Sequence, residues 1–85
     1  MYYVYLIVNE RGDKYIGYTS DLKDRLNRHN KGEVRSTRGH EWKLVYYEAY
    51  RSKSDAIRRE KALKDGRAKY WLMERVRESV SLVLK

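Results

Sequence analysis

The residues best suited to chemistry in this chain include one carboxylate in an unexpected place. Glu60 lies within the apolar stripe that Ala56 and Leu63 form on a predicted helix, at about 100° per residue. Since an isolated buried charge is unfavourable, this carboxylate must be paired, hydrogen-bonded or bound to a cation. A glutamate at the stripe edge that reaches water or pairs with Lys64 fits the same pattern. The position therefore predicts either a metal ligand or an ordinary ion pair.

A second pair of reactive side chains lies on an earlier predicted helix. Arg25 and His29 are one turn apart and can reach the same ligand. A guanidinium can neutralise a phosphate, and an imidazole can transfer a proton near neutral pH. A half-buried histidine beside a surface arginine gives the same spacing, so the pair alone does not decide between these interpretations.

Tyrosines cluster on the two N-terminal predicted strands. By strand alternation Tyr3, Tyr5 and Ile7 share one face, and Tyr15 and Gly17 point together on the second strand. A strand tyrosine usually packs its ring and leaves its hydroxyl in water. The glycine predicts open space beside the second-strand tyrosine, which suits the close approach of a ligand or of another backbone segment.

An α+β fold is expected to position these residues: a small three-stranded antiparallel sheet flanked by helices, in the order β-β-α-β-α-α. Aromatic and β-branched residues over 2–8 and 14–18 predict a hairpin, with its turn at 9–13. Residues 42–50 predict the third strand. The hairpin imposes antiparallel pairing, and the short connections disfavour a doubly wound arrangement.

Three helices complete the predicted order. We expect Ser20 to cap the first helix, with Asp21 in its first turn and Gly32 at its end. Ser52 and Asp55 are expected to form the capping pair of the second helix, which ends near residue 66. An apolar stripe at three- and four-residue spacing predicts one last helix, carried by Ala68, Leu72, Val76, Val80 and Val83.

Length and composition narrow the classes of protein. The 85 residues, 41% of them hydrophobic, can form one compact core, so we expect a single domain over 1–85. The chain has no cysteine, which excludes disulfides and thiolate-bound zinc. Because no apolar run approaches the roughly 20 residues of a membrane-spanning helix, we expect a soluble, cytoplasmic protein with no membrane partner.

The net charge of +8 points to a polyanionic partner. Residues 51–69 hold eight Lys or Arg against three acidic side chains, so the excess belongs to the helical part of the chain. This distribution favours nucleic acid over an acidic protein or a membrane surface. On charge alone, the side chains expected to follow phosphates outside a reaction site are Lys23, Arg28, Lys31, Arg35 and Arg38.

Taken together, these positions resemble the GIY-YIG endonuclease family, and in particular its short standalone members. Tyr3-Val4-Tyr5 stands at the first motif, and Tyr15-Ile16-Gly17 is the second motif intact. Arg25 and His29 follow at the family's spacing, and Glu60 completes the set over about residues 2–72. The chain departs from the pattern in having tyrosine where the first motif has glycine, and tyrosine after the second motif where some relatives have a basic residue.

The resemblance implies an endonuclease that hydrolyses phosphodiester bonds in DNA with one divalent cation, Mg²⁺ or Mn²⁺. Glu60 would hold the metal, and Arg25 would stabilise charge on the phosphoryl oxygens. Tyr5 or Tyr15 would orient or deprotonate the attacking water, with His29 as proton acceptor or hydrogen-bond partner.

The resemblance also implies that Gly17 keeps the backbone slim beside the second-motif tyrosine, and that no small-molecule cofactor is needed. The protein would act as a monomer or a homodimer. The main alternative is a nucleic-acid-binding module of the same fold without useful turnover, which would stack bases on Tyr2, Tyr18 or Trp42. A third interpretation is a protein-interaction role for the basic helices.

Overall fold

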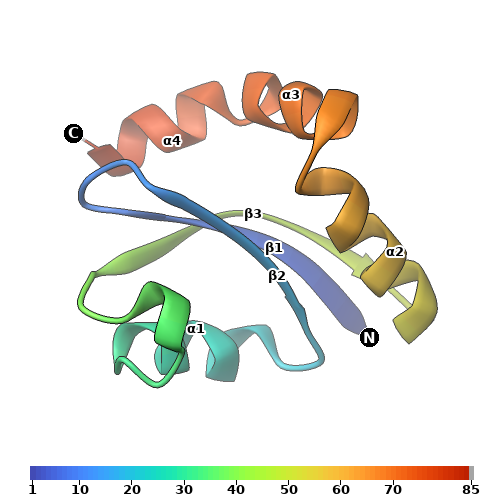
Figure 1. Ribbon diagram of the computed structural model, residues 1–85, viewed down its shortest axis with the longest axis horizontal. Coiled ribbons are helices and arrows are strands. Elements are labelled where there is room, and N and C mark those ends of the chain that lie inside the picture. The colour runs from blue at the N-terminus through green and yellow to red at the C-terminus, as the bar shows by residue number, and fades with distance from the viewer. Residues whose placement is uncertain (85) are drawn as a thin grey trace.

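The computed structural model describes residues 1–84 and contains a three-stranded antiparallel sheet with helices on both faces (Figure 1). The strands are β1 (Tyr2–Asn9), β2 (Lys14–Thr19) and β3 (Trp42–Tyr50), in the spatial order β2-β1-β3. The predicted α+β class and the predicted sheet are confirmed. Within residues 1–84 no helix is long and apolar enough to cross a membrane.

The helices divide unequally between the two faces of the sheet. Helix α1 (Leu22–Asn30) and the short 3-10 helix η1 (Arg35–Thr37) lie on one side, below the sheet in Figure 1. Helices α2 (Lys53–Leu63), α3 (Gly66–Arg75) and α4 (Arg77–Leu84) lie on the other side. The central strand is therefore covered from both directions.

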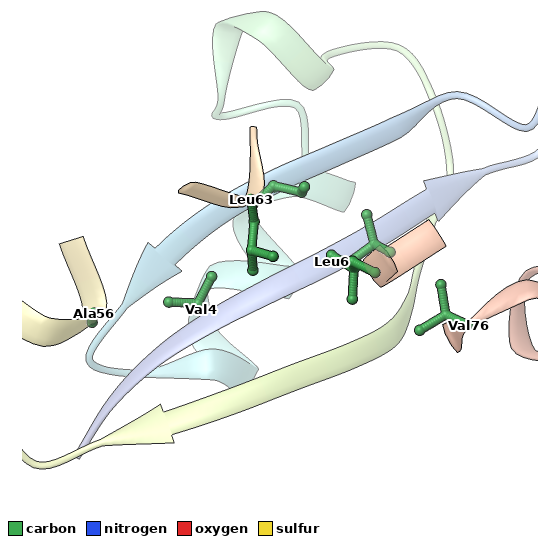
Figure 2. Close-up of a cluster of buried hydrophobic side chains, with 7 residues drawn as sticks. Val4, Leu6, Ala56, Leu63 and Val76 are labelled. Carbon is green, nitrogen blue, oxygen red and sulfur yellow. The ribbon is translucent and has the colours of Figure 1, made fainter. Parts of the chain in front are cut away.

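Strand β1 supplies a different kind of side chain to each face because its residues alternate. Val4 and Leu6 join an aliphatic cluster beneath α2 and α3, in which Ala56 and Leu63 are also buried (Figure 2). On the opposite face, a second cluster includes aromatic side chains and consists of Tyr5, Ile7 and Trp42. Fully burying one aliphatic side chain contributes about 1.5–3 kcal/mol, so the first cluster is a major source of stability.

The first helix boundary differs from its prediction by one residue. Asp21, not Ser20, is the N-cap of α1, and its carboxylate accepts a hydrogen bond of 3.0 Å from the amide of Asp24. A carboxylate at this position also interacts favourably with the helix dipole. At the other end, Gly32 follows the C-cap with φ +76°, a backbone conformation that glycine adopts without strain.

The predicted capping pair of α2 is wrong. Ser52 stands at the N-cap position, but its side chain makes no capping hydrogen bond. Asp55 instead forms an ion pair of 3.1 Å with Arg58 on the helix surface. Gly66 does not follow the end of α2 directly; it begins α3, whose N-cap Asp65 accepts a hydrogen bond from its amide.

The single last helix predicted from the apolar stripe is two helices. Helix α3 ends at Arg75, and Val76 leaves helical geometry with φ −103° and ψ 13°. The amide of Val76 still bonds the carbonyl of Leu72 at 3.1 Å, so the chain bends here without unwinding. Both residues are buried, so the apolar stripe stays on the core across the bend.

Candidate active site

A buried chain of hydrogen bonds joins the first strand to helix α1 and helix η1. The Tyr5 hydroxyl lies 2.7 Å from His29 Nε2, and His29 Nδ1 lies 2.7 Å from Thr37 Oγ1. The threonine hydroxyl donates its hydrogen to the Val34 carbonyl at 3.3 Å, so it accepts from Nδ1. The neutral imidazole therefore carries its hydrogen on Nδ1, and Nε2 accepts from the phenol.

The environment sets the protonation state of both partners. Burial, assisted by the positive charge of Arg25, lowers the pKa of His29 from 6.5 to about 4. Burial raises the pKa of Tyr5 from 10.0 to about 12; the hydrogen bond from Arg25 opposes this rise and the negative charge of Glu60 adds to it. At neutral pH the pair therefore consists of a protonated phenol and a neutral imidazole.

Arg25 places a cation at the edge of this hydrogen-bonded chain. Its Nε donates to the Tyr5 hydroxyl at 3.4 Å, which is a long contact. Hydrogen bonding with Tyr5, against the opposing effect of burial, raises the pKa of Arg25, and Tyr15 adds to the rise. Arg25 takes part in none of the ion pairs found among the described residues, so its charge is available to an anion.

Tyr15 closes the aromatic side of the site. Its ring centroid lies 4.9 Å from that of His29 and 6.4 Å from that of Tyr5. The centroid of the Trp42 ring lies 6.5 Å from that of Tyr15. These edge-on and tilted contacts fix the ring beside the imidazole and direct its hydroxyl toward the region of Arg25.

The space beside Gly17 is filled by a side chain that the sequence did not predict there. This glycine pairs directly with Tyr5 across the hairpin, and a Cβ on Gly17 would lie 2.6 Å from the phenol oxygen and 2.8 Å from the ring carbon that bears it. The same atom would lie 3.1 Å from Cε1 of Tyr15. The space predicted to be open is therefore filled by the phenol, and glycine is what allows that ring to lie across the strand.

Glu60 approaches the site from α2, on the opposite side of the sheet. Its side chain is only 15% exposed, and Oε2 lies 3.5 Å from Nζ of Lys64. Its charge also acts on Tyr5, whose pKa it helps to raise. The carboxylate thus forms the ion pair that the sequence allowed and also lies within electrostatic range of the first-strand phenol.

The donor set limits which metal could be held here. Residues 1–84 contain no group of three or more His, Asp or Glu side chains that could enclose an ion. Mg²⁺ is commonly bound through one or two carboxylates, with waters and substrate phosphates as its other ligands. One carboxylate therefore fits an Mg²⁺ shared with a bound phosphate, and it does not fit a structural zinc site.

The basic residues predicted to follow phosphates lie on the α1 side of the molecule. Arg28 is paired with Asp24 at 2.9 Å, and Nε of Arg38 donates to the Gly32 carbonyl at 2.9 Å. All five are exposed, on α1 or in the segment that follows it: Lys23, Arg28, Lys31, Arg35 and Arg38.

Two features of the site were missed by sequence reasoning. Thr37 lies in a stretch without periodicity, and nothing in the sequence indicates that its hydroxyl holds the imidazole. Trp42, considered there as a stacking platform for bases, is 5% exposed and belongs to the core. The exposed aromatic side chains of α3 are Tyr70 and Trp71, at 58% and 63%.

Comparison with known proteins gives this geometry its context. Residues 1–73 match the model of the GIY-YIG catalytic domain. A UPF0213 protein of Streptococcus agalactiae is 44% identical over 64 residues, which cover 73% of each chain, and one of Halobacterium salinarum is 41% identical over 66 residues, covering 75% of this chain and 86% of that protein. The solution NMR structure of a UPF0213 protein from Bacillus halodurans is 35% identical, with a TM-score of 0.52 over 86% of this chain and 82% of its own. The chain therefore belongs to the GIY-YIG family of nuclease domains.

Proposed function

We propose that the protein is an endonuclease that hydrolyses phosphodiester bonds in DNA with the help of one divalent cation, Mg²⁺ or Mn²⁺. The observation that carries the proposal is the 2.7 Å hydrogen bond between the Tyr5 hydroxyl and His29 Nε2, with Arg25 beside it. A phenol that donates to a neutral imidazole and accepts from Arg25 still has one lone pair with which to accept a hydrogen from water. Membership of a nuclease family supports the same reaction.

In this scheme Tyr5 and His29 act together as the base. The attacking water gives its proton to the phenol oxygen while the phenol proton passes to Nε2 of the imidazole. The water oxygen bonds to phosphorus as the bond from phosphorus to the leaving oxygen breaks. Since the two proton transfers are coupled, the reaction does not require a free phenolate, which the raised pKa of Tyr5 disfavours.

Binding of the phosphate makes the imidazole a better acceptor. The charge of Arg25 is one of the two causes that lower the pKa of His29. A phosphate bound beside that guanidinium would offset the charge, so the pKa of the imidazole would rise toward its usual value when substrate is present. Arg25 would also stabilise the negative charge that develops on the phosphoryl oxygens, a contribution of about 3–4 kcal/mol in comparable sites.

The remaining roles fall to Tyr15 and Glu60. Tyr15, held against the His29 ring, would orient the phosphate or the water, whereas the base role goes to Tyr5 because that hydroxyl contacts the imidazole. Glu60 would bind the cation in exchange for its contact with Lys64. When bound, such an ion polarises the phosphate and stabilises the leaving oxygen.

The test is cleavage of supercoiled plasmid and of short duplex DNA with Mg²⁺ or Mn²⁺, with and without chelator. Wild-type protein should cut only with metal, and Glu60→Gln should lose cutting while it still binds DNA. Glu78→Gln is the matched control, since it removes an exposed carboxylate from the first turn of α4. Equal cutting by wild type and Glu60→Gln would reject the proposed site.

A further inference from the structure

A groove at the edge of the sheet lies outside the catalytic roles assigned above. It has a volume of about 670 Å³ and is formed by edge strand β2, by Lys64 at the C-cap of α2, and by α3. Its lining residues are Lys14, Tyr15, Ile16, Lys64, Lys69 and Met73, and we call it the β2 groove.

The charged side chains that line the β2 groove all have the same sign. They are lysines from β2, from the C-cap of α2 and from α3, and no carboxylate lines the groove with them. Lys14 and Lys69 form no ion pair within residues 1–84, whereas Lys64 pairs with Glu60. A concave surface with one sign of charge and low-dielectric walls concentrates ligands of the opposite charge. The groove therefore fits a polyanion.

Two lining residues connect the β2 groove to the candidate active site. Tyr15 lines the groove, and its ring lies 4.9 Å from the imidazole of His29. Lys64 lines it and contacts the carboxylate of Glu60. The groove therefore shares Tyr15 with the candidate active site and lies next to Glu60 through Lys64, so a phosphate chain bound in the groove would lie beside that site.

We propose that the β2 groove binds the sugar-phosphate backbone of the substrate strand next to the bond that is cut, with Lys14 and Lys69 contacting phosphates. The inference rests on the proposed nuclease function for the identity of its ligand. It moves the main backbone contact from the α1 side, where charge alone had suggested it, to the edge formed by β2, α2 and α3.

Binding without metal tests the groove separately from cleavage. The affinity for a fluorescein-labelled DNA duplex is measured by anisotropy in chelator over a series of salt concentrations. Since each phosphate contact contributes about 0.9 to the slope of log K against log salt, Lys14→Gln with Lys69→Gln should reduce the slope by about 1.8. Lys53→Gln with Lys61→Gln is the matched control, because it removes the same charge from exposed positions of α2 that do not line the groove.

The outcomes separate the two proposals. If wild type binds and cuts DNA while the two double variants have equal salt slopes, the groove assignment is overturned and the nuclease proposal stands. If the groove variant alone shows the reduced slope, the assignment is supported even where cutting is slow. Wild-type protein that binds inorganic polyphosphate through these lysines but does not bind the duplex would overturn the assignment of the ligand.

Circular dichroism during heating should show the same unfolding for all variants, since every substituted side chain is exposed.

Discussion

The central strand β1 buries different kinds of side chain on the two faces of the sheet. Beneath α2 and α3, Val4 and Leu6 are 1% and 0% exposed in an aliphatic cluster. Against α1, Tyr5 is 2% exposed, and it is hydrogen-bonded to His29, which is fully buried, and through it to Thr37. No buried side-chain nitrogen or oxygen among the described residues lacks a partner. The difference shows how polar groups can stay buried. On the α1 face they are joined by a chain of hydrogen bonds, whereas the opposite face supplies apolar packing.

The aliphatic face would also contribute to the proposed reaction, because α2, which packs on it, carries Glu60. Its neighbour Arg59 forms two hydrogen bonds of 2.9 and 3.1 Å with the carboxylate of Glu48 on β3. The hydroxyls of Tyr46 and Tyr50 also donate to that carboxylate. This network attaches α2 to the sheet. Glu60 therefore lies on one face of the sheet, and the rings of Tyr5 and Tyr15 lie on the other.

The largest expected effect tests whether the aliphatic face mainly supplies stability. Leu6→Ala should lower the free energy of unfolding by about 2–5 kcal/mol, since it removes a fully buried side chain and leaves a cavity. The fraction that stays folded in the cold should keep its cleavage rate per molecule. Urea unfolding and cleavage assays on the same preparation measure both quantities. The exposed Leu82→Ala is the control and should change neither; a loss of specific activity larger than the loss of folded protein would contradict the division between the faces.

The strands and their faces could be predicted from the sequence more easily than the contacts between side chains. The hairpin, the third strand and the opposite faces of β1 follow from alternation, a local property of the chain. The space beside Gly17 could not be read correctly, because the ring that fills it comes from another strand. Thr37 could not be found at all, since its role depends on the loop that returns its hydroxyl to the imidazole. The bend at Val76 could not be predicted either, because the apolar stripe continues through it.

A second prediction concerns the pH dependence that the polar face imposes. The unfolded chain protonates His29 below its ordinary pKa of 6.5, whereas the native protein does so only below about 4. Between these values the unfolded state binds more protons, so stability falls as the pH falls from 6.5 to 4 and is unaffected by this group at higher pH. The loss amounts to about 3 kcal/mol over that window.

Urea unfolding at several pH values checks this expectation. Because the carboxylates Glu10 and Glu48 have pKa values lowered from 4.5, the upper part of the window reports mainly on the imidazole. His29→Gln should flatten the dependence between pH 6.5 and 4.5 that the wild-type protein shows. Equal slopes for the wild type and His29→Gln would show that His29 is not held neutral by the fold.

The smallest effect sharpens the comparison within the polar face itself. Gly17→Ala places a methyl group 2.6 Å from the phenol oxygen of Tyr5 and 2.8 Å from the ring carbon that bears it, so the buried ring must move while the hairpin pairing can persist. A displacement of about 1 Å in a reacting group can reduce the rate by as much as about 100-fold, so cleavage by the folded protein should fall by tenfold to 100-fold. Overpacking against the buried ring should also lower the free energy of unfolding by about 1–3 kcal/mol. Tyr5→Phe should also cut slowly, and adding Gly17→Ala to Tyr5→Phe should cost much less than in the wild-type background. If the two losses simply multiply, the glycine acts on the reaction by some route other than the position of that hydroxyl.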